Sequence, residues 1–160
     1  MSKNRQAIFA LEERIEGVTR KMNEVTHGAM SAMVMRLDFV SPVGDIKLWS
    51  DPSKAPKNYR GGQFRGNWQL GVNNKPTRIL YGRIDPSGVN TVAHNIGLIP
   101  VMASRGYKFY LVNNLPYALV LEQGHSTQAP RAFIYRVKRE FNGIVRGIVA
   151  DIKSRGGRTK

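Results

Sequence analysis

Three side chains that could act together chemically lie close in the sequence, at Glu122, His125 and Ser126. A carboxylate, an imidazole and a hydroxyl are the groups of a hydrolytic triad, in which the base activates the nucleophile and the acid orients the base. No G-x-S-x-G turn surrounds Ser126 to expose its hydroxyl, however. Ser126 and Thr127 are also residue types that satisfy backbone groups where one element gives way to the next. We therefore expect no catalytic residue here and no enzymatic activity.

The sequence shows no pattern typical of a metal or cofactor site. His27, His94 and His125 lie far apart, and none has a ligand partner three or four residues further along a helix. The chain has no cysteine, which excludes disulfides and thiolate metal sites. The glycine-rich segment 59–68 lacks the spacing of a phosphate-binding loop. We expect neither a metal nor a cofactor.

Positive charge is the dominant feature of the composition. The 160 residues carry 25 Lys and Arg against 11 Asp and Glu, a formal net charge of +14. Such a charge indicates a polyanionic or strongly acidic partner. From residue 52 to residue 121 the only acid is Asp85. Within this basic middle segment we predict a set of cations that faces either another subunit or DNA, namely Lys54, Lys57, Arg60 and Arg65.

The same composition predicts one domain away from membranes. A chain of 160 residues suffices for a single core. No stretch approaches the roughly 20 apolar residues of a membrane helix, and the first residues lack the apolar segment of a signal peptide. We expect one domain at 1–155 and a basic, disordered tail at 156–160.

Hydrophobic periodicity predicts two long helices. In the first, over 3–40, apolar residues alternate at spacings of three and four and so share one face. Ser2 is a candidate N-cap, and Ser41-Pro42 ends the run. At about 1.5 Å per residue this helix would be on the order of 50 Å long. Because that exceeds the width of a compact domain, we expect part of it to pack on something else. The second helix runs from after Pro130 to about Ser154.

Between the two helices the pattern predicts a long loop at 41–63, four strands and a short helix. The predicted strands are 64–73, 77–84, 107–114 and 117–124, the last two forming a hairpin, and the predicted helix is 89–103. This order predicts an α+β fold, in which a four-stranded antiparallel sheet packs against a long N-terminal helix, a short middle helix and a C-terminal helix.

The stretch 113–130 resembles a signature of bacteriophage tail-completion proteins, also known as neck or head-to-tail joining proteins. Their pattern is an Asn-rich turn, Pro-Tyr-Ala, an apolar strand, Glu-x-Gly, a small polar pair and Gln-Ala-Pro before the last helix. The matching residues are Asn113, Asn114, Pro116, Tyr117, Ala118, Glu122, Gly124, Ser126, Gln128, Ala129 and Pro130. A second family element is similar to 41–45 and 61–69, but here an insertion separates its halves and leaves the role of the loop open.

The resemblance implies a structural virion protein without catalytic residues. It implies completion of the proximal end of a phage tail and joining to the head connector, as a hexameric ring around the DNA channel. The implied partners are copies of the chain, the tail tube protein and the head-closure protein, with non-specific DNA contact. The implied location is the tail and neck of the virion, assembled in the host cytoplasm. The alternative is a nucleic-acid-binding module that uses the basic middle segment.

In this interpretation the stretch 113–130 is a structural corner. Asn114 and Gln128 would satisfy backbone groups that a sharp turn leaves unpaired. Tyr117 would anchor the turn through a buried ring and a bonded hydroxyl. The predicted corner residues are Asn114, Pro116, Tyr117, Glu122, Gly124, Gln128 and Pro130.

Overall fold

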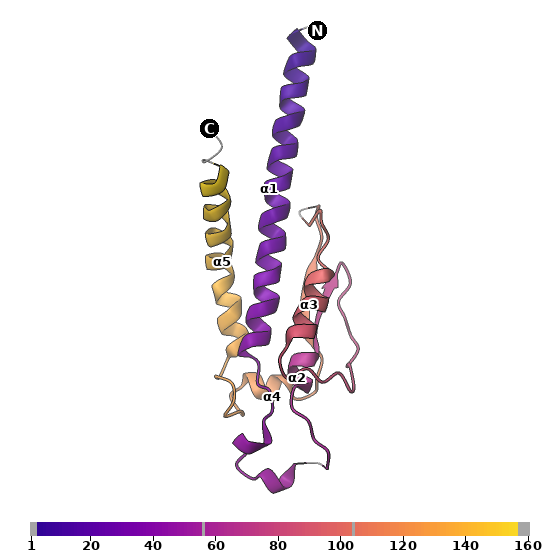
Figure 1. Cartoon of the computed structure of the whole chain (residues 1–160), viewed down its shortest axis with the longest axis vertical. Helices are drawn as coiled ribbons and strands as arrows, with labels where there is room; N and C mark the ends of the chain where they lie inside the picture. Colours follow the sequence, from indigo (N-terminus) through magenta and orange to yellow (C-terminus); the bar gives the residue numbers. More distant parts are fainter. Residues whose placement is uncertain (1–2, 56, 104, 157–160) are drawn as a thin grey trace.

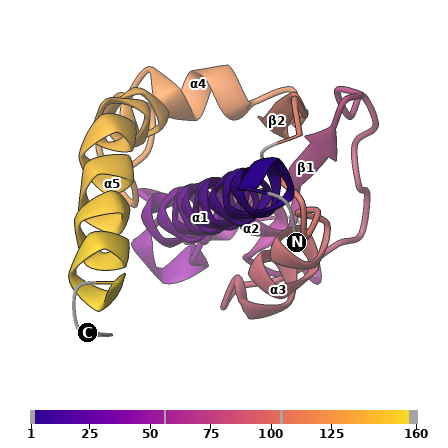
Figure 2. The ribbon, with the colours of Figure 1, turned by 90° about the horizontal axis from the view of Figure 1, so that it is seen from above.

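In the computed structural model of the chain, residues 3–55, 57–103 and 105–156 are described. Two long helices, α1 (Lys3–Val40) and α5 (Phe133–Gly156), lie side by side. Seen from above, α1 is central, with α5 on one side and the sheet and α3 on the other (Figure 2). The N-terminal half of α1 extends well beyond the rest of the molecule (Figure 1). Both long helices were predicted, although the N-cap proposed at Ser2 lies outside the described residues.

α5 accompanies only the second half of α1. The two helices run antiparallel, and ion pairs join Arg36 to Glu140 and Arg155 to Glu24. These pairs are exposed, so each stabilises the fold little and chiefly fixes the register. Gly28 lets Ile148 approach the backbone of α1, because a Cβ added there would lie 3.3 Å from Ile148 Cδ1. α5 ends opposite Glu24, and it leaves the first part of α1 without this neighbour.

The sheet has two strands, so the prediction of a four-stranded sheet was wrong. β1 (Trp68–Val72) pairs antiparallel with β2 (Phe109–Asn113). The region predicted as the first strand begins with a short helix, α2 (Gln63–Gly66). The region predicted as the last strand is a helix, α4 (Ala118–Glu122). In α4, Ala118 and Leu121 pack on the core while the two residues between them are exposed, a helical spacing that so short an apolar run does not reveal.

The strand predicted at 77–84 is an irregular loop because amide side chains take the place of strand pairing. Asn67, which is fully buried, donates from Nδ2 to the carbonyl of Leu80 and accepts from its N–H, at 3.2 and 2.8 Å. Gln69 Nε2 donates to the carbonyl of Arg78 at 2.8 Å. These side chains satisfy backbone groups that a neighbouring strand would otherwise pair.

Helix α3 (Val89–Gly97) covers the edge of β1 that β2 leaves open; it is shorter than the predicted 89–103. Asn95 Oδ1 accepts from the N–H of Leu70, and its Nδ2 donates to the carbonyl of Trp68, both at 2.9 Å. Asn95 is 1% exposed. One side chain therefore satisfies two buried backbone groups at the edge of the strand.

The core lies where the second half of α1, the sheet and the start of α5 meet. Trp68 Nε1 donates to Ser41 Oγ at 2.8 Å, and Ser41 Oγ donates to the carbonyl of Leu37 at 2.6 Å. These two linked hydrogen bonds close the C-terminal end of α1, whose last carbonyls have no partner within the helix. The main buried cluster consists of Leu37, Phe64, Trp68, Leu115, Ala129, Phe133 and Val137, and a second cluster consists of Leu70, Ile99 and Ala103.

α5 continues to Gly156 and so includes the first residue of the predicted tail at 156–160. Residues 157–160 lie outside the described part of the chain. Among the described helices, none is both long and apolar enough to cross a membrane.

A buried polar junction joins α1 to the start of α3. Asp85 accepts from the N–H groups of Gly88 and Thr91 at 3.0 and 2.7 Å, and from Thr91 Oγ1 at 2.8 Å. Asp38 of α1 is 4% exposed, and its Oδ1 has no hydrogen-bond partner. Gly88 is required here, because its φ of +76° favours glycine and a Cβ would overlap the Asp38 carboxylate.

Asp38 is expected to make stability depend on pH. Burial raises the pKa of its carboxyl to about 6; Arg65 opposes this shift and Asp85 adds to it. Because this pKa exceeds that of the unfolded chain, the stability that protonation contributes is complete below about pH 4 and is lost as the pH rises through 6.

Asp38→Asn should therefore be more stable than the parent protein at neutral pH, by about 1–3 kcal/mol, and should lose this advantage near pH 4. Chemical unfolding of both proteins across this range measures the difference, and the other carboxylates cancel in the comparison. Parallel stability curves would contradict the assignment.

Candidate functional site

The predicted corner is built around the start of α5. Glu122, at the end of α4, accepts from the N–H groups of Ile134 and Tyr135 at 2.9 and 3.0 Å. These N–H groups belong to the first turn of α5 and have no partner within the helix. A carboxylate is also favoured beside the positive end of the helix dipole. The Glu122 carboxylate therefore caps the N-terminus of α5.

Glu122, His125 and Ser126 do not form a triad. Ser126 Oγ accepts from the N–H of Gln128 at 3.1 Å and so shapes the turn. His125 is exposed, and the Glu122 carboxylate is bonded to the backbone of α5 instead. Within the described ranges, no three acidic, histidine or cysteine side chains gather in a way that could hold a metal ion.

Gln128 fastens the long loop to the corner. Its Oε1 accepts from the N–H groups of Gly44 and Asp45, both at 2.9 Å, and its Nε2 donates to the carbonyl of Asp45 at 3.1 Å. Thr127 Oγ1 donates to the carbonyl of Leu48 at 3.3 Å. The loop 41–63 is therefore folded onto the corner within a single chain.

The remaining corner residues hold neighbouring loops. Asn114 Nδ2 donates to the carbonyls of Pro76 and Arg78, both at 3.1 Å. Gly124 has a φ of +96°, which favours glycine. Both prolines of the corner are exposed. The amide of Asn114 thus satisfies backbone groups of the irregular segment at 76–78 rather than of the corner itself.

Tyr117 is less covered than the sequence predicts. Its hydroxyl lies 3.4 Å from Gln63 Oε1 and its ring centroid 6.1 Å from that of Phe64, yet the residue is 38% exposed. Burial, with a smaller effect from Tyr59, raises the pKa of Tyr117 to about 12. The phenol is therefore neutral at physiological pH.

A cleft of about 590 Å³ separates the long loop from the corner. The loop contains two short 3₁₀ turns, η1 (Ile46–Leu48) and η2 (Pro52–Lys54). On the loop side, Trp49 and Tyr59 pack edge to face with ring centroids 5.1 Å apart. Tyr117, Phe64 and Leu121 line the opposite side. The arrangement provides aromatic surface and hydroxyl groups, which suit binding rather than catalysis.

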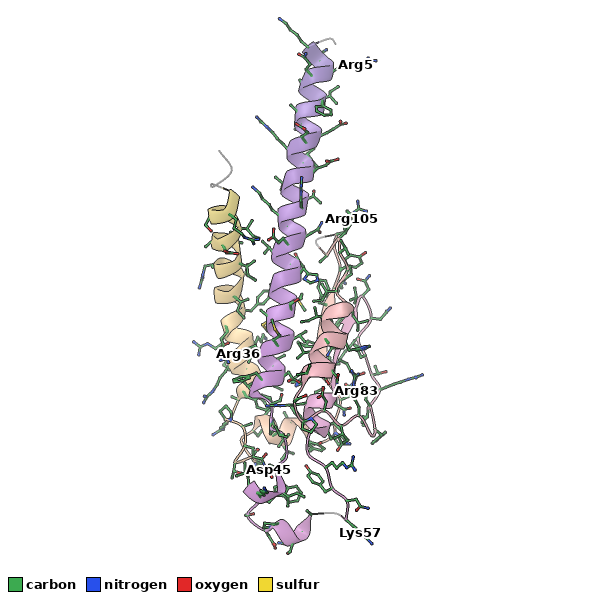
Figure 3. All side chains as sticks on the ribbon, in the orientation of Figure 1. Arg5, Arg36, Asp45, Lys57, Arg83 and Arg105 are labelled. Atoms are coloured by element: carbon green, nitrogen blue, oxygen red, sulfur yellow. The ribbon has the colours of Figure 1, made fainter. Side chains whose placement is uncertain are left out.

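Three of the four predicted cations are exposed on this loop. Lys54 lines the cleft and lies 3.5 Å from Asp51. Lys57 and Arg60 flank Tyr59 in the sequence, and Lys57 lies near the tip of the loop (Figure 3). These cations can contact a polyanion or an acidic surface without rearrangement of the fold.

Arg65 lies elsewhere and has a structural role. Its guanidinium donates to three backbone carbonyls at the end of α1 and before α3, at 2.9–3.2 Å. These carbonyls belong to Phe39, Ser41 and Pro86. Because the backbone occupies its donors, Arg65 is poorly placed to face DNA or another subunit.

A second candidate surface is the free half of α1. Its apolar residues are each more than half exposed, whereas Ala29, which continues the same spacing, is buried. The sequence pattern joins both halves into one stripe, and only the half beside α5 is covered. We call the exposed part the α1 stripe; it consists of Ile8, Leu11, Ile15, Val18 and Met22.

Comparisons of the chain with protein-family models, curated proteins and solved structures found no match.

Replacing Gln128 should release the loop. Gln128→Ala removes three hydrogen bonds, each contributing about 1 kcal/mol, so trypsin should cleave the loop on the order of a hundredfold faster. Lys47, Lys54 and Lys57 are the sites to follow by mass spectrometry. Gln123→Ala, at an exposed position of the same corner, is the matched control. Equal cleavage rates in both variants would show that Gln128 does not hold the loop.

Proposed function

We propose that the chain is a non-enzymatic structural subunit of a phage virion. Copies of it would form a ring that completes the proximal end of the tail and joins it to the head connector. The phage setting rests on the resemblance of the 113–130 and 41–69 segments to tail-completion proteins. Self-assembly rests on one structural observation, the uncovered α1 stripe.

The α1 stripe is difficult to reconcile with a chain that works alone. Its five apolar residues are 53–59% exposed along one face of a helix. A contiguous apolar face of this kind typically marks an interaction site. The part of α1 beyond α5 also has no α5 to pack on, and most of the stability of a helix in a protein comes from tertiary packing of its apolar face. A partner along the stripe would supply both burial and support.

Glutamates on the free half of α1 can pair with the basic middle segment of a second copy. The free half carries Glu12, Glu13 and Glu16 but also five cations, so the match by charge is local to residues 12–16. This part of the helix of one copy can thus meet the basic body of the next. Because the two surfaces differ, the contact is heterologous, and repetition of such a contact closes a ring when the rotation permits. In this proposal the tail tube and head-closure proteins lie on the two faces of the ring.

The loop supports the same role. Gln128 and Thr127 hold it against the corner in a single chain, so that each subunit presents a finished surface at the end opposite the free half of α1 (Figure 1). A protein that works by fitting between neighbours needs such preformed surfaces, because ordering a loop on binding lowers affinity.

Ile15→Asp tests the stripe directly. A carboxylate buried in a helix interface costs several kcal/mol, so we expect self-association to weaken by at least about a hundredfold in analytical ultracentrifugation. Ala10→Asp adds the same charge to an exposed position off the stripe and should leave self-association unchanged. A parent protein that stays monomeric at every concentration, or equal effects of both variants, would count against the stripe as a contact between copies.

Electron microscopy of particles made without the protein tests the role in the virion. Overlong tails would indicate a tail terminator, and tails of normal length beside separate filled heads would indicate a joining protein. Intact, infectious virions that lack the polypeptide would contradict a role in the virion.

The alternative, a nucleic-acid-binding module, gains support from exposed Lys57 and Arg60, while Arg65 no longer contributes to it. Contact driven by charge alone requires no particular geometry.

A further inference from the structure

We propose that the cleft between the loop 41–63 and the corner binds a nucleotide unit, with its base against the aromatic walls and its phosphate on the loop cations. The ligand class is single-stranded nucleic acid or a free nucleotide, which share this chemistry. The proposal goes beyond assembly and does not depend on the ring.

The size and walls of the cleft suit a base. Sites for small ligands span about 300–1,000 Å³, and this cleft has about 590 Å³. Trp49 and Tyr59 are half-buried and Tyr117 is 38% exposed, so each presents aromatic surface to the cleft. Stacking of a base on an aromatic side chain contributes about 1–3 kcal/mol.

Neutral polar groups in the same cleft can pair with the edge of a base. Gln63 offers an amide, and the hydroxyls of Tyr59 and Tyr117 each donate and accept. Burial raises the pKa of both phenols, which keeps them uncharged beside an anionic ligand. The hydroxyl of Tyr59 lies against Gly44, where an added Cβ would overlap it.

The cations available to an anion lie on the long loop. Lys54 lines the cleft, and Lys57 and Arg60 are exposed elsewhere on the same loop. Asp51, which also lines the cleft, accepts from the N–H of Ser53 and lies 3.5 Å from Lys54. A phosphate next to a stacked base would therefore share Lys54 with Asp51 and draw on Lys57 and Arg60 from the rest of the loop.

Trp49 provides the assay. Trp68 is 3% exposed in the core, whereas Trp49 lines the cleft, so a stacked base should quench the fluorescence of Trp49. The purified full chain is titrated with a short oligothymidylate, with thymidine monophosphate and with a duplex of the same length. We expect the oligothymidylate to quench and the duplex not to, and Trp49→Phe should abolish the signal. Quenching by the monophosphate with equal affinity would identify a free nucleotide as the ligand.

Two sets of variants separate the site from general charge. Lys57→Ala with Arg60→Ala should weaken oligothymidylate binding at least about tenfold more than Lys138→Ala with Arg139→Ala, which removes the same charge from exposed positions on α5. Tyr117→Leu should lower affinity about tenfold or more without changing its dependence on salt, because it removes stacking and no charge. Tyr117→Phe keeps the ring and should retain most of the affinity.

Three results would overturn the proposal. The first is equal weakening by the two double variants, and the second is binding of oligothymidylate without any change in Trp49 fluorescence. Either result would show that oligothymidylate binds through charge alone and not in the cleft. The third is equal quenching by a peptide of glutamate and tyrosine, which would assign the cleft to acidic peptides.

Discussion

The closure of the C-terminal end of α1 is the interaction on which the rest of the structure depends. Trp68 bonds Ser41, Ser41 bonds the carbonyl of Leu37, and Arg65 donates to carbonyls of the same helix end. The last carbonyls of a helix need partners from outside it. Ser41 serves the carbonyl of Leu37, whereas Arg65 and Trp68, which follow the long loop, bond to Phe39 and Ser41, so ending the helix also returns the chain to the core. The loop is thereby held beside the corner, where the cleft forms.

Side-chain amides form backbone hydrogen bonds of the kind that neighbouring strands form in larger sheets. Asn95 satisfies the open edge of β1, Asn67 and Gln69 hold the segment after it, and Gln128 holds the loop. Each of these side chains satisfies backbone groups at only one or a few positions and does not require a regular neighbouring strand. A two-stranded sheet, marginal by itself, is stabilised in this way between α1 and α3. The resulting body presents a projecting helix at one end and a cleft at the other.

The outcome of the sequence predictions follows from the range of each signal. Periodicity over many turns predicted α1 and α5 nearly to their ends, because a long amphipathic face excludes other structures. Short apolar runs did not separate strand from helix at 117–124, and nothing local shows that the partners of 77–84 are amides. Arg65 was grouped with outward-facing cations because its charge is visible in the sequence, whereas the three carbonyls that it serves come from two other segments. The cleft was missed for the same reason, since its walls come from parts of the chain far apart.

By itself, the sequence determined the excess of positive charge, the lack of thiols, the two long helices and the spacing of their apolar residues. Only the tertiary structure decided which part of the apolar face of α1 is covered, because that depends on where α5 ends beside Glu24. It also decided that Glu122 caps a helix and that Trp49, Tyr59 and Tyr117 share one cleft. The physical reason is that charge and periodicity are properties of the chain itself, whereas burial and hydrogen-bond partnership arise when distant segments meet.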